Sequence, residues 1–235
     1  MFDHDIFGHA LMDYAQGKTA QPLILHNSYS TAEEMPVDIF FRKEDDLTEL
    51  EEIALSLCDG LVLDIGAGTG THAFWLQQRN QQVHALEQSP LACQWMLKQG
   101  ILHVIAEDFF NFKPTVKYNT LLFLMNGIGI TGTILGFENF LSTAKEWLGK
   151  NGQLIFDSSD IGYLYEDVSI PKPKDRYHGE ITYQYEYKGT KDKPFNWLYL
   201  DINTLIHLGH KHQWVVQVLY EDDMDQYLVR MEPRL

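Results

Sequence analysis

The chain has 235 residues, of which 45% are apolar, so it is long enough to bury the core of one domain. Its 33 acidic residues outnumber its 18 basic residues, which gives a net charge of -15. A field of this sign repels polyanions and, because lysine and arginine form no dense cluster, argues against a nucleic-acid partner.

Export and membrane insertion are not indicated by the sequence. The chain begins with the acidic run 1–5, which is unlike a signal peptide. The most apolar span, 121–137, is broken by Asn126 and four glycines, which excludes a transmembrane helix. The two cysteines, Cys58 and Cys93, fall in apolar helical patterns. We therefore expect buried free thiols and a cytoplasmic protein.

The N-terminal part predicts two helices and a short extended segment. Apolar residues recur on one face of 5–16, and Gly17 is suited to end that helix. Residues 22–26 are expected to be extended. Thr48 followed by Glu51 forms a capping box, which predicts the start of the second helix.

A short apolar strand followed by a glycine-rich turn is the central motif. Residues 61–63 lead into Asp64, and Gly66, Gly68 and Gly70 follow at alternate positions. Glycine is needed where the backbone adopts positive φ or lies close against a ligand. The helix that begins after the turn presents free N–H groups and a positive dipole end to negative or carboxylate-bearing groups.

The following strand, 83–86, ends in Glu87, a carboxylate placed to accept both hydroxyls of a ribose. A glycine loop with such an acid about 20 residues further on is typical of nucleotide binding. The glycine spacing selects the nucleotide, because a dinucleotide fingerprint would need glycine in place of Thr71. The G-x-G-x-G spacing after an acid instead resembles motif I of the class I S-adenosylmethionine (SAM)-dependent methyltransferases.

This resemblance implies a doubly wound, Rossmann-like α/β domain. Its seven-stranded sheet would be mostly parallel, with an antiparallel C-terminal strand. The family places an acid on the adenine amino group at the end of the third strand, 102–106, where Asp108 and the adjacent Phe109 are the candidates. The fourth strand, 120–125, ends in Asn126, a place that faces the sulfonium methyl in the family.

The resemblance and the spacing together give a set of predicted cofactor-binding residues. The cofactor is SAM, and the set consists of Asp64, Gly66, Ala67, Gly68, Gly70, Glu87, Gln88, Asp108, Phe109, Asn126, Gly127 and Arg42. Methyltransferases that act on DNA amino groups carry an Asn/Asp-Pro-Pro-aromatic turn after the fourth strand, which this chain lacks. That departure is a second argument against nucleic acid.

The rest of the chain continues the α/β pattern and then departs from it. A glycine turn precedes the fifth strand, 153–156, which ends in a polar stretch at 157–160. Breaker residues at 171–174 form a linker. The remaining predicted elements are a helix at 138–148, strands at 181–187 and 195–199, a helix at 202–212, and a terminal hairpin of 214–220 and 226–231.

The two strands after the linker form a predicted inserted β-hairpin with one aromatic face. Its aromatic residues alternate with polar ones, and they are Tyr183, Tyr185, Tyr187, Phe195, Trp197 and Tyr199. A face of this kind must be covered. Three partners could bury this face: the chain's own core, a small substrate over the mouth of the cofactor site, or a second subunit in a homodimer.

We interpret the chain as a single domain, 1–235, with four parts. These are an N-terminal lid at 1–47, a SAM-binding core at 48–160, an inserted linker and hairpin at 161–200, and a terminal helix and hairpin at 201–235. The lid is inferred from the resemblance, since an N-terminal extension often closes over the cofactor in this fold. An ordinary packing helix is the alternative. Arg42 would contact the cofactor carboxylate or an acidic substrate.

The predicted reaction is methyl transfer from SAM to an unidentified nucleophile, most readily a small molecule. Catalysis can rest on positioning and exclusion of water, and candidates for a base are Asp157, Asp160, His72 and Tyr14. The alternatives are a non-catalytic SAM or nucleotide sensor and, third, an NAD-dependent oxidoreductase.

No metal site is predicted. His207, His210 and His212 lack a cysteine or carboxylate partner in the sequence pattern. The run at 3–5 and the acidic turn at 221–225 are expected to be solvated surface, and neither has the pattern of a calcium loop.

Overall fold

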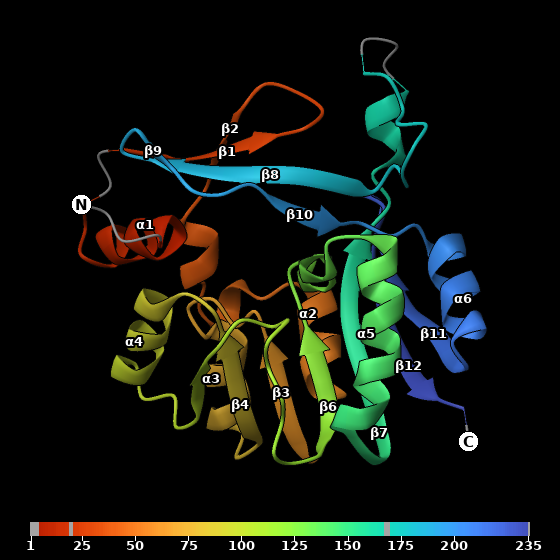
Figure 1. Ribbon diagram of the computed structural model, residues 1–235. Helices are drawn as coiled ribbons and strands as arrows, with labels where there is room; N and C mark the ends of the chain where they lie inside the picture. The colour runs from red at the N-terminus through yellow and green to blue at the C-terminus, as the bar shows by residue number, and fades with distance from the viewer. Residues whose placement is uncertain (1–4, 19–20, 167–169, 235) are drawn as a thin grey trace. The chain divides into compact units, whose positions relative to one another are not determined.

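The computed structural model describes residues 5–18, 21–166 and 170–234 (Figure 1). Its contacts divide the chain into two compact units. Unit 1 comprises Met1–Leu47, Asp64–Phe112 and Thr182–Phe195. Unit 2 comprises Thr48–Leu63, Lys113–Ile181 and Asn196–Leu235.

The larger of the two sheets has seven strands in the order β11-β12-β7-β6-β3-β4-β5, which confirms the predicted fold class. The strands are β3 (Leu61–Ile65), β4 (Gln82–Glu87), β5 (Val104–Ala106), β6 (Tyr118–Phe123), β7 (Leu148–Ser159), β11 (Trp214–Glu221) and β12 (Gln226–Pro233). Strands β4 and β5 pair in parallel, as do β6 and β7. The last strand, β12, lies antiparallel between β7 and β11, as the terminal hairpin predicts.

The helices described in unit 1 begin after the capping residues Asp5, Gly70 and Ser89. They are α1 (Ile6–Ala15), α3 (Thr71–Gln78) and α4 (Pro90–Lys98). Ser89 caps α4 through its hydroxyl, with Pro90 in the first turn, and Gly100 follows the helix at φ 90°. Strand β5 begins later than predicted because the Gln77 side chain binds the backbone of Gly100 and Leu102.

Unit 2 contains α2 (Glu49–Ser56), α5 (Ile134–Trp147) and α6 (Ile202–Lys211). The predicted capping box of Thr48 and Glu51 is present. Helix α5, which contacts β7 (Figure 1), starts earlier than the predicted 138 because Thr133 caps it. The short helices of the described residues are η1 (Asp38–Phe41), η2 (Glu44–Asp46), η3 (Gly127–Thr131) and η4 (Gly162–Tyr165).

The smaller sheet is a feature that the sequence did not predict. The inserted strands do not form an isolated hairpin, because the N-terminal strand β1 pairs antiparallel with β8. The order is β10-β8-β1-β2, with β9 paired to β8. The strands are β1 (Leu23–Asn27), β2 (Glu33–Met35), β8 (Glu180–Tyr187), β9 (Thr190–Lys191) and β10 (Phe195–Leu198).

Within unit 1, the aromatic face of β8 packs against the chain's own N-terminal segment. Tyr187 is buried in a small core with Ile6, Ala10 and Leu23. The ring of Tyr185 stacks on that of Phe7 with centroids 5.4 Å apart. The sequence left three possible partners for the aromatic face. For this part of it, the partner is the chain's own N-terminal segment.

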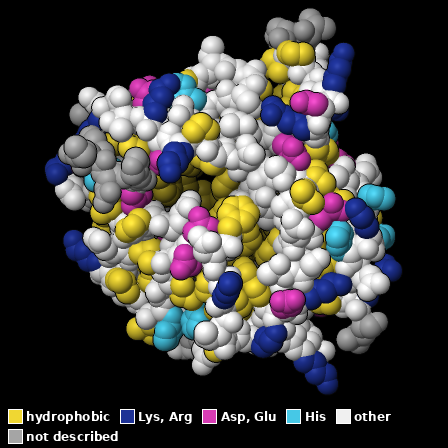
Figure 2. Space-filling model, viewed as in Figure 1, with side chains coloured by type: hydrophobic (Ala, Val, Ile, Leu, Met, Phe, Trp, Pro, Cys, Tyr) yellow, Lys and Arg dark blue, Asp and Glu magenta, His cyan; other side chains and the backbone are white. Residues whose placement is uncertain are grey.

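Three further properties of the fold concern membrane insertion, the cysteines and the surface cations. No helix in the described ranges is long and apolar enough to span a membrane. Cys93 is buried as expected, whereas Cys58 is only half-buried because it lies just beyond the C-terminal end of α2. On the face drawn in Figure 2, lysine and arginine side chains are spread out singly or in small groups.

Candidate functional site

The glycine loop joins β3 to α3 in unit 1. Gly66, Gly68 and Gly70 have φ values of 72°, 57° and 84°, all in the left-handed region that favours glycine. The N–H groups of Gly66 and Ala67 both donate to the carbonyl of Leu86, at 2.9 and 3.1 Å. The loop is therefore fastened to the carboxyl end of β4, and the spacing of its glycines follows from its backbone conformation.

Glu87 holds the same loop through its side chain. It is only 7% exposed; its Oε2 accepts the N–H of Gly68 at 2.9 Å, and its Oε1 accepts the N–H of Ser89 at 2.8 Å. Burial raises the pKa of Glu87, and these two N–H groups oppose that rise. The carboxylate predicted to bind a ribose thus also orders the glycine loop.

Asp5 is a residue whose role the sequence analysis missed. The expectation that 3–5 is solvated surface is wrong for Asp5, while residues 3 and 4 lie outside the described part. Asp5 caps α1 by accepting the N–H of Gly8, and its Oδ2 accepts from the Ser89 hydroxyl at 2.9 Å and the Leu91 N–H at 3.1 Å. Its place directly before an amphipathic helix was the available signal for the cap.

Asp64 and His72 form a buried electrostatic pair at the base of the loop. Asp64 is 2% exposed and His72 is 6% exposed. Burial raises the pKa of Asp64, while the charge of His72 and the N–H of Ala73 lower it. Its Oδ2 has no hydrogen-bond partner among the described residues. His72 lies in the first turn of α3, and its burial fits a packing role better than the predicted role of a base.

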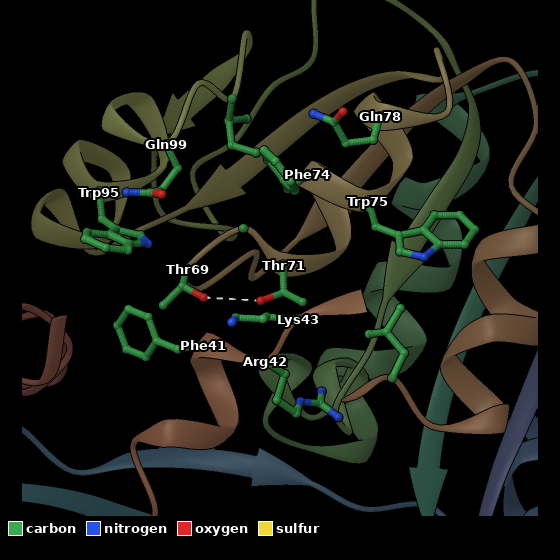
Figure 3. A pocket seen from close by; sticks show the side chains of 13 residues that line it. Phe41, Arg42, Lys43, Thr69, Thr71, Phe74, Trp75, Gln78, Trp95 and Gln99 are labelled. Atoms are coloured by element: carbon green, nitrogen blue, oxygen red, sulfur yellow. Dashed lines mark hydrogen bonds between the residues drawn. The ribbon is translucent and has the colours of Figure 1, made fainter. Parts of the chain in front are cut away.

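Arg42 lies in the wall of a cavity of about 270 Å³ that also includes part of the glycine loop (Figure 3). The lining residues are Phe41, Arg42, Lys43, Leu47, Thr69, Gly70, Thr71, Phe74, Trp75, Gln78, Trp95, Gln99 and Ile101. The hydroxyls of Thr69 and Thr71 both donate to the carbonyl of Phe40. The segment before Arg42 is thereby attached to the loop. The ring of Tyr14 packs on Phe41 with centroids 4.9 Å apart.

The adenine candidates lie after β5, next to the end of β4. The N–H of Glu107 donates to the carbonyl of Glu87 at 3.1 Å, which brings the two strand ends together. Asp108 is half-buried and its Oδ1 accepts the N–H of Phe110 at 2.7 Å. Phe109 is buried, whereas Gln88 is exposed.

The remaining predicted residues belong to unit 2. Asn126 has φ 56° and ψ 27°, and it precedes the short helix η3, which begins at Gly127. Asp157 is fully buried, and its Oδ2 accepts the N–H of Asn126 at 2.8 Å. Asp160 is half-buried and accepts the N–H of Gly162 at 2.8 Å.

Of the three histidines considered as metal ligands, His207 and His210 lie on α6 and His212 caps its C-terminal end. His212 lies 3.0 Å from Glu138, a carboxylate partner that the sequence pattern did not reveal. No group of three or more potential metal ligands occurs within the residues that the structure describes.

Residues of unit 1 fit a nucleotide-bearing cofactor. A Cβ on Gly68 would meet only the Phe40 ring, at 4.0 Å, so the loop leaves space on that side. The helix α3 begins directly after the loop, and an acid and an aromatic residue follow at β4 and β5. Backbone donors, a carboxylate and a ring are the groups that such a cofactor needs.

Comparison with solved structures identifies the family, although no protein-family model and no curated protein matches the chain. A SAM-dependent methyltransferase from Bacteroides fragilis, solved in complex with S-adenosyl-L-homocysteine (SAH), is 32% identical. The match covers 99% of this chain and 96% of that chain, with a TM-score of 0.90.

Two further structures share the fold at lower identity. A DhpI-SAM-HEP complex is 14% identical, with 99% and 100% of the two chains covered and a TM-score of 0.64. The CcbJ methyltransferase from Streptomyces caelestis is 13% identical, with full coverage of both chains and a TM-score of 0.65. The fold, the glycine loop and the relative with bound SAH agree on the cofactor, which is SAM. The chain belongs to the SAM-dependent methyltransferases.

Proposed function

We propose that this enzyme transfers the methyl group of SAM to a small-molecule nucleophile. The observation that supports the cofactor assignment is the glycine loop. Its three glycines have positive φ, and the N–H groups of Gly66, Ala67 and Gly68 donate to Leu86 and Glu87. Asp64, Gly66, Ala67, Gly68 and Gly70 would then hold the methionyl part, and Glu87 the ribose. Gln88, Asp108 and Phe109 would hold the adenine. In unit 2, Asn126 and Gly127 are the further residues that we propose for cofactor binding.

The chain's own residues have limited chemistry to supply. SAM carries an activated methyl group on its sulfonium, so alignment of the acceptor and exclusion of water can provide most of the rate enhancement. A base is required only when the acceptor atom carries a proton that must leave. Asp160 and Tyr14 remain candidates for that role, since each is half-buried rather than enclosed.

The N-terminal segment would close the cofactor site. Supporting this proposal, Asp5 attaches α1 to the start of α4, and the Phe40 carbonyl attaches the following segment to Thr69 and Thr71. Arg42 shares a cavity with the loop and would contact a carboxylate of the cofactor or of an acidic acceptor.

A small acceptor is favoured over a macromolecular polyanion by charge. The net charge is -15, and the cations on the face in Figure 2 are dispersed. Phosphate backbones are bound by gathered lysines and arginines. The turn after β6 also lacks the paired prolines seen in DNA amino methyltransferases.

Isothermal titration with SAM, SAH and NAD tests the cofactor assignment. SAM and SAH should bind in the micromolar range, and Gly68→Val should abolish binding because valine disfavours the φ of 57° at this position. A matched control is Gly189→Val, at φ 75° in an exposed turn, which carries the same backbone strain outside the site. Binding of NAD without SAM would refute the proposal.

The acceptor is sought with methyl-tritiated SAM and a metabolite panel. Label should appear in a small, extractable product and not in added DNA or RNA. Label found only in nucleic acid would refute the acceptor class. SAM binding without transfer to any fraction would favour the sensor alternative.

Hydrogen exchange tests the lid. Peptides from α1 and from 38–47 should gain protection when SAH is added. Unchanged exchange in both peptides would leave the segment as ordinary packing.

A further inference from the structure

The turn after β6 contains two consecutive residues in an unfavourable backbone conformation. Met125 and Asn126 have φ values of 61° and 56°, and neither is glycine. Asparagine tolerates left-handed backbone, but methionine does not, and a residue of that kind persists there only where its surroundings hold it. Strained residues of this kind cluster at functional sites. The residues that restrain this turn are therefore relevant to its function.

Asp157 is the main restraint on the turn. Its side chain is 0% exposed on β7, and its Oδ2 accepts the backbone N–H of Asn126 at 2.8 Å. The same oxygen accepts from Nε2 of Gln226 on β12 at 2.7 Å. A carboxylate bond to a backbone N–H is a charge-assisted hydrogen bond, so it is strong enough to oppose the strain.

The side chain of Asn126 is restrained separately. The hydroxyl of Ser159, two residues after Asp157 on the same strand, donates to Oδ1 of Asn126 at 2.9 Å. Backbone and side chain of Asn126 are thus fixed by two different residues of β7. This arrangement leaves the Nδ2 group of the carboxamide without a partner among the described residues.

We propose that Asp157 is a positioning residue that holds Asn126 in place for cofactor binding, and that it does not act as the base. The inference rests on the proposed function, in which Asn126 is part of the cofactor site. A fully enclosed carboxylate whose Oδ2 already accepts two hydrogen bonds is suited to fixing geometry. A base needs an oxygen within hydrogen-bond reach of the acceptor.

The test uses SAH as the probe, because SAH binding needs no methyl acceptor. Asp157→Ala should weaken SAH binding at least tenfold by calorimetry. Asp157→Asn retains an oxygen for the Asn126 N–H, and its affinity should stay within threefold of wild type. The base alternative differs at Asp157→Ala, because removal of a base leaves SAH affinity unchanged in that variant as well as in Asp157→Asn.

A rescue variant separates positioning from general destabilisation. Met125→Gly removes the strain at φ 61°, because glycine adopts positive φ freely. Added to Asp157→Ala, it should recover at least threefold of the lost affinity. The matched control is Asn151→Gly, which replaces an exposed residue at φ 60° near the start of β7 in unit 2 and should recover none.

Ser159→Ala is a milder variant that keeps the inference testable if Asp157→Ala does not fold. It releases the Asn126 carboxamide without touching the backbone turn. SAH affinity should fall about threefold to tenfold with an unchanged melting temperature, and Met125→Gly should not restore it.

The outcomes discriminate between the hypotheses. Unchanged SAH affinity in Asp157→Ala and Ser159→Ala, or equal rescue by Met125→Gly and Asn151→Gly, would overturn the positioning role. Wild-type protein that does not bind SAH would overturn the proposed function and this inference with it.

Discussion

Glu87 offers the sharpest test of how the glycine loop is held. Its carboxylate accepts the buried N–H groups of Gly68 and Ser89, at 2.9 and 2.8 Å. A hydrogen bond to a charged group contributes about 1.5–3 kcal/mol, so Glu87→Ala removes at most about 3–6 kcal/mol. Burial raises the pKa of Glu87, so the carboxylate is itself costly to enclose. The net loss should therefore be about 2–4 kcal/mol.

This loss converts into a measurable change in melting temperature. For a chain of 235 residues, 1 kcal/mol corresponds to about 2–4 °C, so Glu87→Ala should melt about 4–16 °C lower by calorimetry. Glu87→Gln retains one oxygen for one of the two N–H groups and should lose about half as much. SAH affinity of Glu87→Ala should fall at least tenfold, equivalent to about 1.4 kcal/mol, because ribose contact and loop order are lost together.

The matched control is Glu34→Ala, which removes an exposed carboxylate from β2 in the same unit. An exposed substitution of this kind changes stability by within about 0.5 kcal/mol. If Glu87→Ala has the same melting temperature as Glu34→Ala and wild type, the two backbone hydrogen bonds do not hold the loop. If Glu87→Ala melts lower but binds SAH normally, the ribose assignment fails.

Three other predictions concern packing and burial. A Cβ on Gly129 would lie 2.0 Å from Nε1 of Trp197, so Gly129→Ala should cost about 1–3 kcal/mol in denaturant unfolding. Adding Trp197→Ala should cost less than the sum of the two single changes. Burial raises the pKa of the Cys93 thiol to about 12, so at pH 8.5 iodoacetamide should modify Cys58 and spare Cys93 until the protein unfolds. Asp5→Ala should cost about 0.5–2 kcal/mol through loss of the cap of α1 and should speed hydrogen exchange in that helix; unchanged exchange would contradict its role.

Features carried by local sequence were predictable. Gly66, Gly68 and Gly70 all have positive φ. Glycines at alternate positions after a strand indicate such a backbone, because glycine adopts positive φ without steric cost. The capping box of Thr48 was equally predictable, because both of its partners lie within three residues. These signals identified the glycine loop and the helix that follows it, and the fold class followed from the family resemblance that the loop carries.

Features that depend on distant partners were not predictable. Strand β1 pairs with β8, and the His26 side chain bonds Glu186 across 160 residues of sequence. Residues 22–26 were correctly predicted to be extended. The sequence pattern of an extended segment does not identify the strand with which it pairs. The second sheet was therefore missed, although every strand assigned to it except β2 and β9 was expected.

The turn after β6 shows the same limit at the level of the site. Its two strained residues are methionine and asparagine, and methionine gives no sign of a left-handed conformation. Strand β6 was consequently predicted to run through 125, whereas it ends at Phe123. The restraints lie on β7 and β12, at Asp157 and Gln226, which are 31 and 100 positions away from Asn126. From the sequence alone, an acid that follows a strand is interpreted as a candidate catalytic base. Only the arrangement of its hydrogen bonds favours a residue that shapes the backbone, so its function depends on partners that the sequence does not place beside it.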